Sequence, residues 1–193
     1  MNKFLKDLRS AFDKVDKSYY SSMAFTGESE NTENEEKKEY TQFVERVFAY
    51  ELYHQYRLII KKCDDNRYTE NELKLNAEIT KNGFEHTKIG KARIFPDMVL
   101  HKNQTNNDIN NQVLFIEIKV QENCSFDDDI KKMIVALSDR LNYQNAVLIS
   151  INHNNAIQKV KEFNRLTKID ANLLQKLWLF TEKDSLNFKQ ILE

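Results

Sequence analysis

The stretch VLFIEIKV, residues 113–120, decides the fold that we expect for this chain. β-branched and aromatic residues dominate it, which is typical of a buried strand. Because side chains alternate between the two faces of a strand, Phe115, Glu117 and Lys119 should share one face. The other face carries Leu114, Ile116, Ile118 and Val120. Two charges inside an apolar strand need partners, because burying an unpaired charge is costly.

Two more strands are expected upstream. Residues 73–79 alternate apolar and polar side chains, and residues 92–102 form a second strand that Pro96 interrupts or starts. Together with the strand around Glu117, they predict a meander. Asp97 stands at the head of the second strand, so the meander can bring its carboxylate beside that of Glu117.

Helical periodicity before and after these strands completes the expected architecture. We expect a helix at 40–62 and, after the meander, a helix at 126–143 whose acidic first turn, Asp127 to Asp129, suits the helix dipole. The chain should continue with a strand at 146–152, a helix at 155–166, a strand at 174–180 and a polar tail. This order predicts an α/β sandwich, with a mixed central sheet flanked by helices.

The composition sets the expected organisation and setting. The 193 residues suit one main domain at 40–193, preceded by a helical appendage at 1–24 and an acidic, flexible linker at 25–39. Charges interrupt the apolar residues near the N-terminus, which argues against a signal peptide or a membrane partner. Cys63 and Cys124 have no metal-binding or disulfide spacing, so we expect a cytoplasmic protein. A net charge of −1 excludes a wholly basic nucleic-acid coat.

The helix at 40–62 offers a further carboxylate. Its apolar face, which should press on the sheet, is expected to carry Val44, Phe48, Glu51, Gln55 and Leu58. A carboxylate at the position of Glu51 favours a bound cation, and Gln55 could fix that carboxylate or touch a phosphate. Glu45 is the competing candidate, but it falls beside this face and is interpreted more simply as a solvated residue.

Asp97, Glu117 and Lys119 are the residue types that a metal-dependent phosphodiesterase needs. Carboxylates hold Mg²⁺ or Mn²⁺, and the Ile118 carbonyl can add an oxygen ligand. A lysine ammonium can position or help deprotonate the attacking water. Other Glu-x-Lys triplets occur in the chain, but only this one lies inside an apolar strand.

These residues resemble the PD-(D/E)xK nuclease superfamily. The resemblance is carried by Pro96-Asp97 and by Glu117-x-Lys119 after a hydrophobic strand, preceded by a glutamate-bearing helix. The expected order of elements over residues 40–151 is similar to the restriction-endonuclease-like αβββαβ core of that family. The resemblance implies a metal-dependent nuclease acting on DNA and, less often, on RNA. It also implies Asp97 and Glu117 as metal ligands, Lys119 as the catalytic lysine and Glu51 as the helical acid.

Accessory residues are expected around this motif. His101 shares strand parity with Asp97 and could face the same cleft, and Arg93 lies close by in the sequence. Basic residues outnumber acidic ones by three in 81–102 and again in 156–168. Such patches suit a phosphate backbone, although surface lysines are commonly only solvated.

Two alternatives to an active nuclease stay open. The first is a catalytically silent nuclease-like fold that acts as a nucleic-acid-binding or protein-interaction module. The second is an unrelated α/β domain in which Asp97 and Glu117 pair with Lys119 and Arg93 in a structural salt network. The sequence leaves the oligomeric state open, a dimer included.

Overall fold

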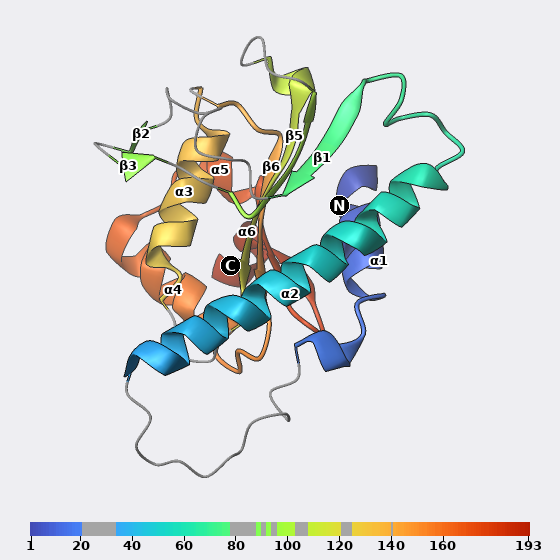
Figure 1. Ribbon diagram of the computed structural model, residues 1–193. Helices are drawn as coiled ribbons and strands as arrows, with labels where there is room; N and C mark the ends of the chain where they lie inside the picture. The colour runs from blue at the N-terminus through green and yellow to red at the C-terminus, as the bar shows by residue number, and fades with distance from the viewer. Residues whose placement is uncertain are drawn as a thin grey trace.

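A six-stranded mixed sheet organises the described part of the chain (Figure 1). The computed structural model describes residues 1–20, 34–77, 88–89, 92–93, 96–102, 108–120, 125–139 and 141–193, with only the backbone described at 34–43, 88–89 and 92–93. In spatial order, the strands are β1 (Leu73–Ala77), β4 (Met98–Lys102), β5 (Gln112–Lys119), β6 (Asn145–Ser150), β7 (Leu177–Phe180) and β8 (Ser185–Asn187). A separate two-stranded ribbon consists of β2 (Lys88–Ile89) and β3 (Ala92–Arg93).

The predicted meander is present, and its register positions the motif. Strands β1, β4 and β5 are antiparallel neighbours, whereas β5, β6 and β7 run parallel to one another. Met98 pairs with Ile116, so Asp97, one residue earlier, comes level with Glu117 on the adjacent strand.

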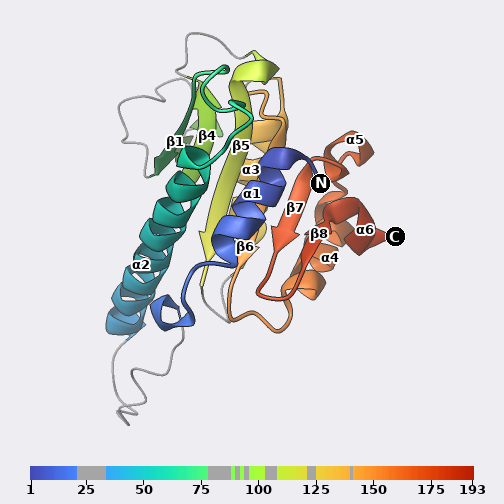
Figure 2. The same ribbon diagram turned by 90° about the vertical axis from the view of Figure 1, so that its right-hand side faces the viewer.

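Helices cover both faces of the sheet, which confirms the predicted α/β class (Figure 2). One face packs against α1 (Lys3–Phe12) and α2 (Asn34–Lys61), with the short η1 (Lys17–Tyr19) between them in the chain. The other face packs against α3 (Asp127–Leu137), α4 (Ala156–Thr167) and α6 (Phe188–Leu192). The short helices α5 (Ala171–Leu174) and η3 (Ile109–Asn111) lie in connections. None of the helices within the described ranges has the length and apolar character to cross a bilayer.

Several element boundaries differ from those expected. Helix α2 begins at Asn34, so residues 34–39 are helical although we expected them in the linker. Helix α3 ends at Leu137, and the chain then turns through Asn142, which has a left-handed backbone with φ of 57°. The segment after β7, expected as a polar tail, forms β8 and α6 because Phe188 anchors it in the core.

Helix α1 is part of the core, whereas we expected an appendage. Its buried residues are Leu5, Leu8, Ala11 and Phe12, and they join the cluster that fills the α1–α2 side of the sheet. At its other side, Arg9 donates hydrogen bonds to the carbonyls of Thr181 (2.6 Å) and Glu182 (3.2 Å). The helix therefore joins the turn that follows β7 to the rest of the fold.

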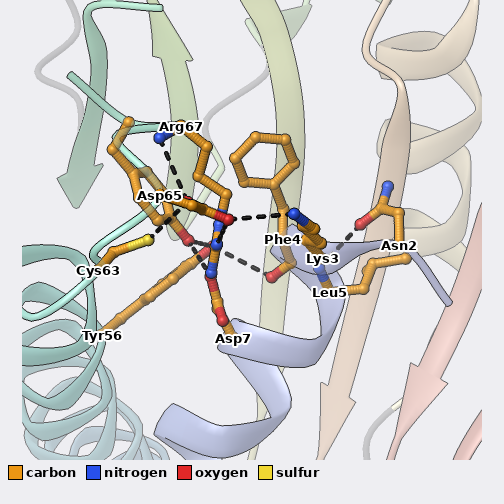
Figure 3. Close-up of polar contacts among 10 residues, drawn as sticks. Asn2, Lys3, Phe4, Leu5, Asp7, Tyr56, Cys63, Asp65 and Arg67 are labelled. Carbon is orange, nitrogen blue, oxygen red and sulfur yellow. Dashed lines mark hydrogen bonds and ion pairs between the residues drawn. The ribbon is translucent and has the colours of Figure 1, made fainter. Parts of the chain in front are cut away.

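A polar cluster ties α1 to the turn after α2 (Figure 3). Asp7 forms an ion pair with Arg67 and accepts a hydrogen bond from the Tyr68 hydroxyl at 2.6 Å. Asp65 accepts hydrogen bonds from Lys3 (3.1 Å) and from the Cys63 thiol (3.0 Å). These contacts fix the direction in which the chain enters β1.

Truncating α1 in the core should therefore destabilise the whole protein. Leu8 is fully buried, so Leu8→Ala should cost about 2 to 5 kcal/mol in the free energy of unfolding, measured by urea denaturation. Leu166→Ala is the matched control, because this leucine is 73% exposed and its loss should cost less than about 0.5 kcal/mol. Equal, small effects would mean that α1 is the appendage expected from the sequence.

Candidate active site

The face of β5 that carries Glu117 and Lys119 is the one predicted by the alternation. Phe115 packs in the cluster on the α3–α4 side, whereas Ile116 and Ile118 pack in the cluster on the α1–α2 side. Glu117 follows the parity of Phe115, and its side chain is 1% exposed. The sheet thus buries a carboxylate beneath α3.

Asp97 lies beside Glu117, as the register requires. The backbone N–H of Ile118 donates a hydrogen bond to Oδ2 of Asp97 at 2.7 Å. Burial raises the pKa of Glu117 well above its usual range, and the neighbouring Asp97 carboxylate raises it further. Burial also raises the pKa of Asp97, although the Ile118 N–H and Lys119 act in the opposite direction. The carboxylates of Asp97 and Glu117 therefore share a confined space where β4 and β5 pair.

The Ile118 backbone faces the same space. The carbonyl of Lys119 accepts a hydrogen bond from the Ile151 N–H at 2.8 Å, so Lys119 directs its backbone groups toward β6. Successive residues of a strand direct these groups to opposite sides, and the Ile118 carbonyl therefore points toward β4 and Asp97.

Helix α3 contributes two charged residues that the sequence analysis did not single out. Lys132 contacts Oε2 of Glu117 and Oδ1 of Asp129, each at 3.0 Å. The second oxygen of Asp129 lies 3.4 Å from Lys119, and the Asp129 side chain is 5% exposed. We had explained Asp129 by the helix dipole alone. Its spacing of four from Met133, a buried residue of α3, was the signal for an inward-facing acid.

Helix α2 contributes Glu45, which approaches Lys119 at 3.7 Å. Burial raises the pKa of Glu45 to about 7, and the opposing effect of Lys119 does not restore its usual value. Our interpretation of Glu45 as a solvated residue is therefore wrong. Its side chain is only 24% exposed.

The structure does not bring Glu51 and Gln55 to this group. Gln55 donates a hydrogen bond to Glu51 at 2.6 Å. The buried face of α2 consists of Phe48, Ala49, Leu52 and Tyr56, a face that Glu45 shares by its spacing. Glu51 is separated from Glu45 by about 120° around the helix and about 9 Å along its axis, so it faces elsewhere. Leu58, expected on the apolar face, is 37% exposed.

His101 also lies apart from these residues. His101 is buried in β4 and contacts the Asn76 side chain at 2.7 Å. It stands four residues beyond Asp97, about 13 Å along the strand, and a β-bulge follows Leu100. Burial and Lys74 lower the pKa of His101. Arg93 lies in β3, where only the backbone is described.

Six charged side chains thus gather at one end of β5, and we call them the β5 charge cluster. They are Glu45, Asp97, Glu117, Lys119, Asp129 and Lys132. Burial lowers the pKa of Lys119, but the surrounding carboxylates, Asp129 first, outweigh it and raise that pKa above its usual value. Lys119 is therefore a protonated cation at neutral pH in this arrangement. Fully ionised, four carboxylates and two ammonium groups leave a formal charge of −2.

Within the described ranges, His, Cys, Asp and Glu side chains form no group of three or more arranged to hold a metal ion. No family model matches the chain, and no curated protein or solved structure shows significant similarity to it.

The raised pKa of Glu45 makes stability depend on pH. Its folded pKa of about 7 exceeds the unfolded value of 4.5, so the folded state binds more protons in this window. Stability should fall as the pH rises from about 5 to 7, with Glu45 contributing at most about 3 kcal/mol.

Glu45→Gln should flatten this part of the profile in urea denaturation measured at several pH values. Glu51→Gln removes a carboxylate from the same helix outside the β5 charge cluster, and it should keep the wild-type slope. If the two variants show the same slope, the contact between Glu45 and Lys119 is not part of the folded state in solution.

Proposed function

We propose that the protein is a metal-dependent nuclease of the PD-(D/E)xK type, using Mg²⁺ or Mn²⁺ and acting on DNA in preference to RNA. The observation that carries the proposal is the pairing of Asp97 and Glu117 across the β4–β5 step, with Lys119 on the same face of β5 as Glu117. The order α2, β1, β4, β5, α3, β6 supports it, because, apart from the separate β2–β3 ribbon between β1 and β4, it matches the αβββαβ order that the resemblance implies.

The residues of the β5 charge cluster fit a divalent cation. Oε1 of Glu117 is buried and has no hydrogen-bond partner among the described residues. When all its side chains are ionised, the cluster has a formal charge of −2, which one divalent cation would neutralise. Mg²⁺ is commonly bound by one or two carboxylates, with water and substrate phosphate completing its coordination, so a group of three acidic side chains is not required. Asp97, Glu117 and the Ile118 carbonyl are the proposed ligands.

The proposed helical acid is Glu45, in place of Glu51. Glu45 contacts Lys119 and belongs to the same cluster as Asp97 and Asp129. Its role is to fix the ammonium of Lys119 from the α2 side, or to bind a water molecule of the metal.

Lys119 and the metal have separate roles in the proposed reaction. When bound, Mg²⁺ polarises the phosphodiester and lowers the pKa of a bound water. Lys119, held between Asp129 and Glu45, presents a protonated ammonium that orients the attacking water and stabilises the negative charge that develops on the phosphate. Its raised pKa favours this electrostatic role over that of a general base.

One observation favours a second candidate, the catalytically silent module. Lys119 and Lys132 both pair with carboxylates of the β5 charge cluster, so the chain's own cations partly neutralise these acids without a metal. Exposed basic residues of α4, such as Lys161 and Arg165, would then bind the phosphate backbone of a nucleic acid that the protein does not cleave.

A cleavage assay with purified protein separates the two candidates. With Mn²⁺ or Mg²⁺, the wild type should cut at least one of linear, circular, branched or single-stranded DNA, with RNA as a parallel substrate. Lys119→Met should lower the rate by about 10² to 10³ while retaining metal binding in calorimetry. Asp97→Asn should lose both cleavage and metal binding.

Glu51→Gln is the matched control and should cleave like the wild type, whereas Glu45→Gln should be impaired. If the wild type binds nucleic acid but cuts none of the substrates with either metal, the silent module is the better description.

A further inference from the structure

Lys132 is bound to the carboxylate that the proposed function assigns to a metal. Its ammonium lies 3.0 Å from Oε2 of Glu117, whereas Oε1 of the same carboxylate has no partner among the described residues. The Glu117 side chain is 1% exposed, so a cation is needed nearby to keep it ionised. Among the described residues, Lys132 is the cation in direct contact with it.

Lys132 also has a second anion within reach. Asp129 lies one helical turn earlier on α3, at 3.0 Å from the same ammonium. Because this contact does not involve Glu117, the ammonium can leave Glu117 and stay paired. The lysine side chain is 28% exposed and flexible, so a shift of its head group toward solvent needs no movement of the backbone.

A metal and an ammonium compete at the same carboxylate. Both are compact positive charges, and like charges within a few ångström repel each other strongly in a poorly solvated site. A divalent cation between Asp97 and Glu117 would therefore displace Lys132 from Glu117.

We propose that Lys132 is a positioning residue that holds Glu117 in place without metal and yields to a divalent cation while remaining paired with Asp129. This inference rests on the proposed metal site and adds to it an exchange of one cation for another. A purely structural ion pair would only stabilise the fold. In this proposal, Lys132 stabilises the fold without metal and also weakens metal binding, because it competes with the metal for Glu117.

The test is Mn²⁺ titration by calorimetry, together with thermal denaturation in EDTA and in Mn²⁺. Lys132→Met should bind Mn²⁺ with a dissociation constant at least about tenfold lower than that of the wild type, because the competing ammonium is gone. The same variant should melt at a lower temperature than the wild type in EDTA, and Mn²⁺ should raise its melting temperature more than it raises that of the wild type.

Three further variants sharpen the test. Lys131→Met is the matched control, since Lys131 pairs on the surface with Asp128 at 3.3 Å, and it should bind Mn²⁺ like the wild type. Lys132→Gln repeats the measurement with a polar side chain in case the methionine variant fails to fold. Lys132→Arg keeps the positive charge and should restore the weaker, wild-type affinity.

The outcomes separate this inference from the proposed function. If the wild type and both neutral variants at position 132 bind Mn²⁺ equally well, or if the variants bind it more weakly, the exchange is refuted and the metal site stands. If no protein binds Mn²⁺, both the exchange and the metal site are refuted. If the variants bind more tightly but no protein cleaves nucleic acid, the exchange stands and the nuclease activity is refuted.

Discussion

The burial of Glu117 is the constraint on which the rest of the site depends. Strand β5 fills the centre of the sheet and is apolar on the α1–α2 side, yet its other face carries a carboxylate 1% exposed. A charge in such surroundings must be paired. Helix α3 therefore brings Lys132 to it, Asp129 holds Lys132 and Lys119, and Glu45 of α2 completes a chain of alternating charges.

Such an arrangement is expensive if it serves stability alone. Replacing a buried ion pair by apolar side chains is often neutral or stabilising, so a salt network is a poor way to strengthen a core. Here the pKa values of Asp97, Glu117 and Glu45 are all raised, chiefly by burial. Acids held under such conditions are characteristic of functional sites, where a ligand relieves their mutual repulsion.

The face on which a residue lies could be predicted from the sequence where the pattern of apolar residues allowed only one assignment. An apolar strand of period two permits one assignment of faces, so the parity of Glu117 and the neighbourhood of Asp97 could be predicted. Helix α2 is different, because apolar residues such as Val47, Leu52 and Tyr53 occur on several of its sides. Only the packing of α2 on the sheet shows that the buried face is the one that contains Glu45. Asp129 was hidden for another reason, since the helix dipole already accounted for acids in the first turn of α3.

The hydrogen bonds of Arg9 carry a consequence for biosynthesis. This guanidinium, near the start of the chain, binds the carbonyl of Thr181, 172 residues later. Its helix also packs onto β5, whose position depends on the parallel strands beyond it. During translation, the part of α1 that packs onto β5 must therefore stay undocked until β5 and the strands beyond it have left the ribosome. A nascent chain with an apolar helix surface uncovered in this way is a natural client for chaperones that bind exposed apolar segments.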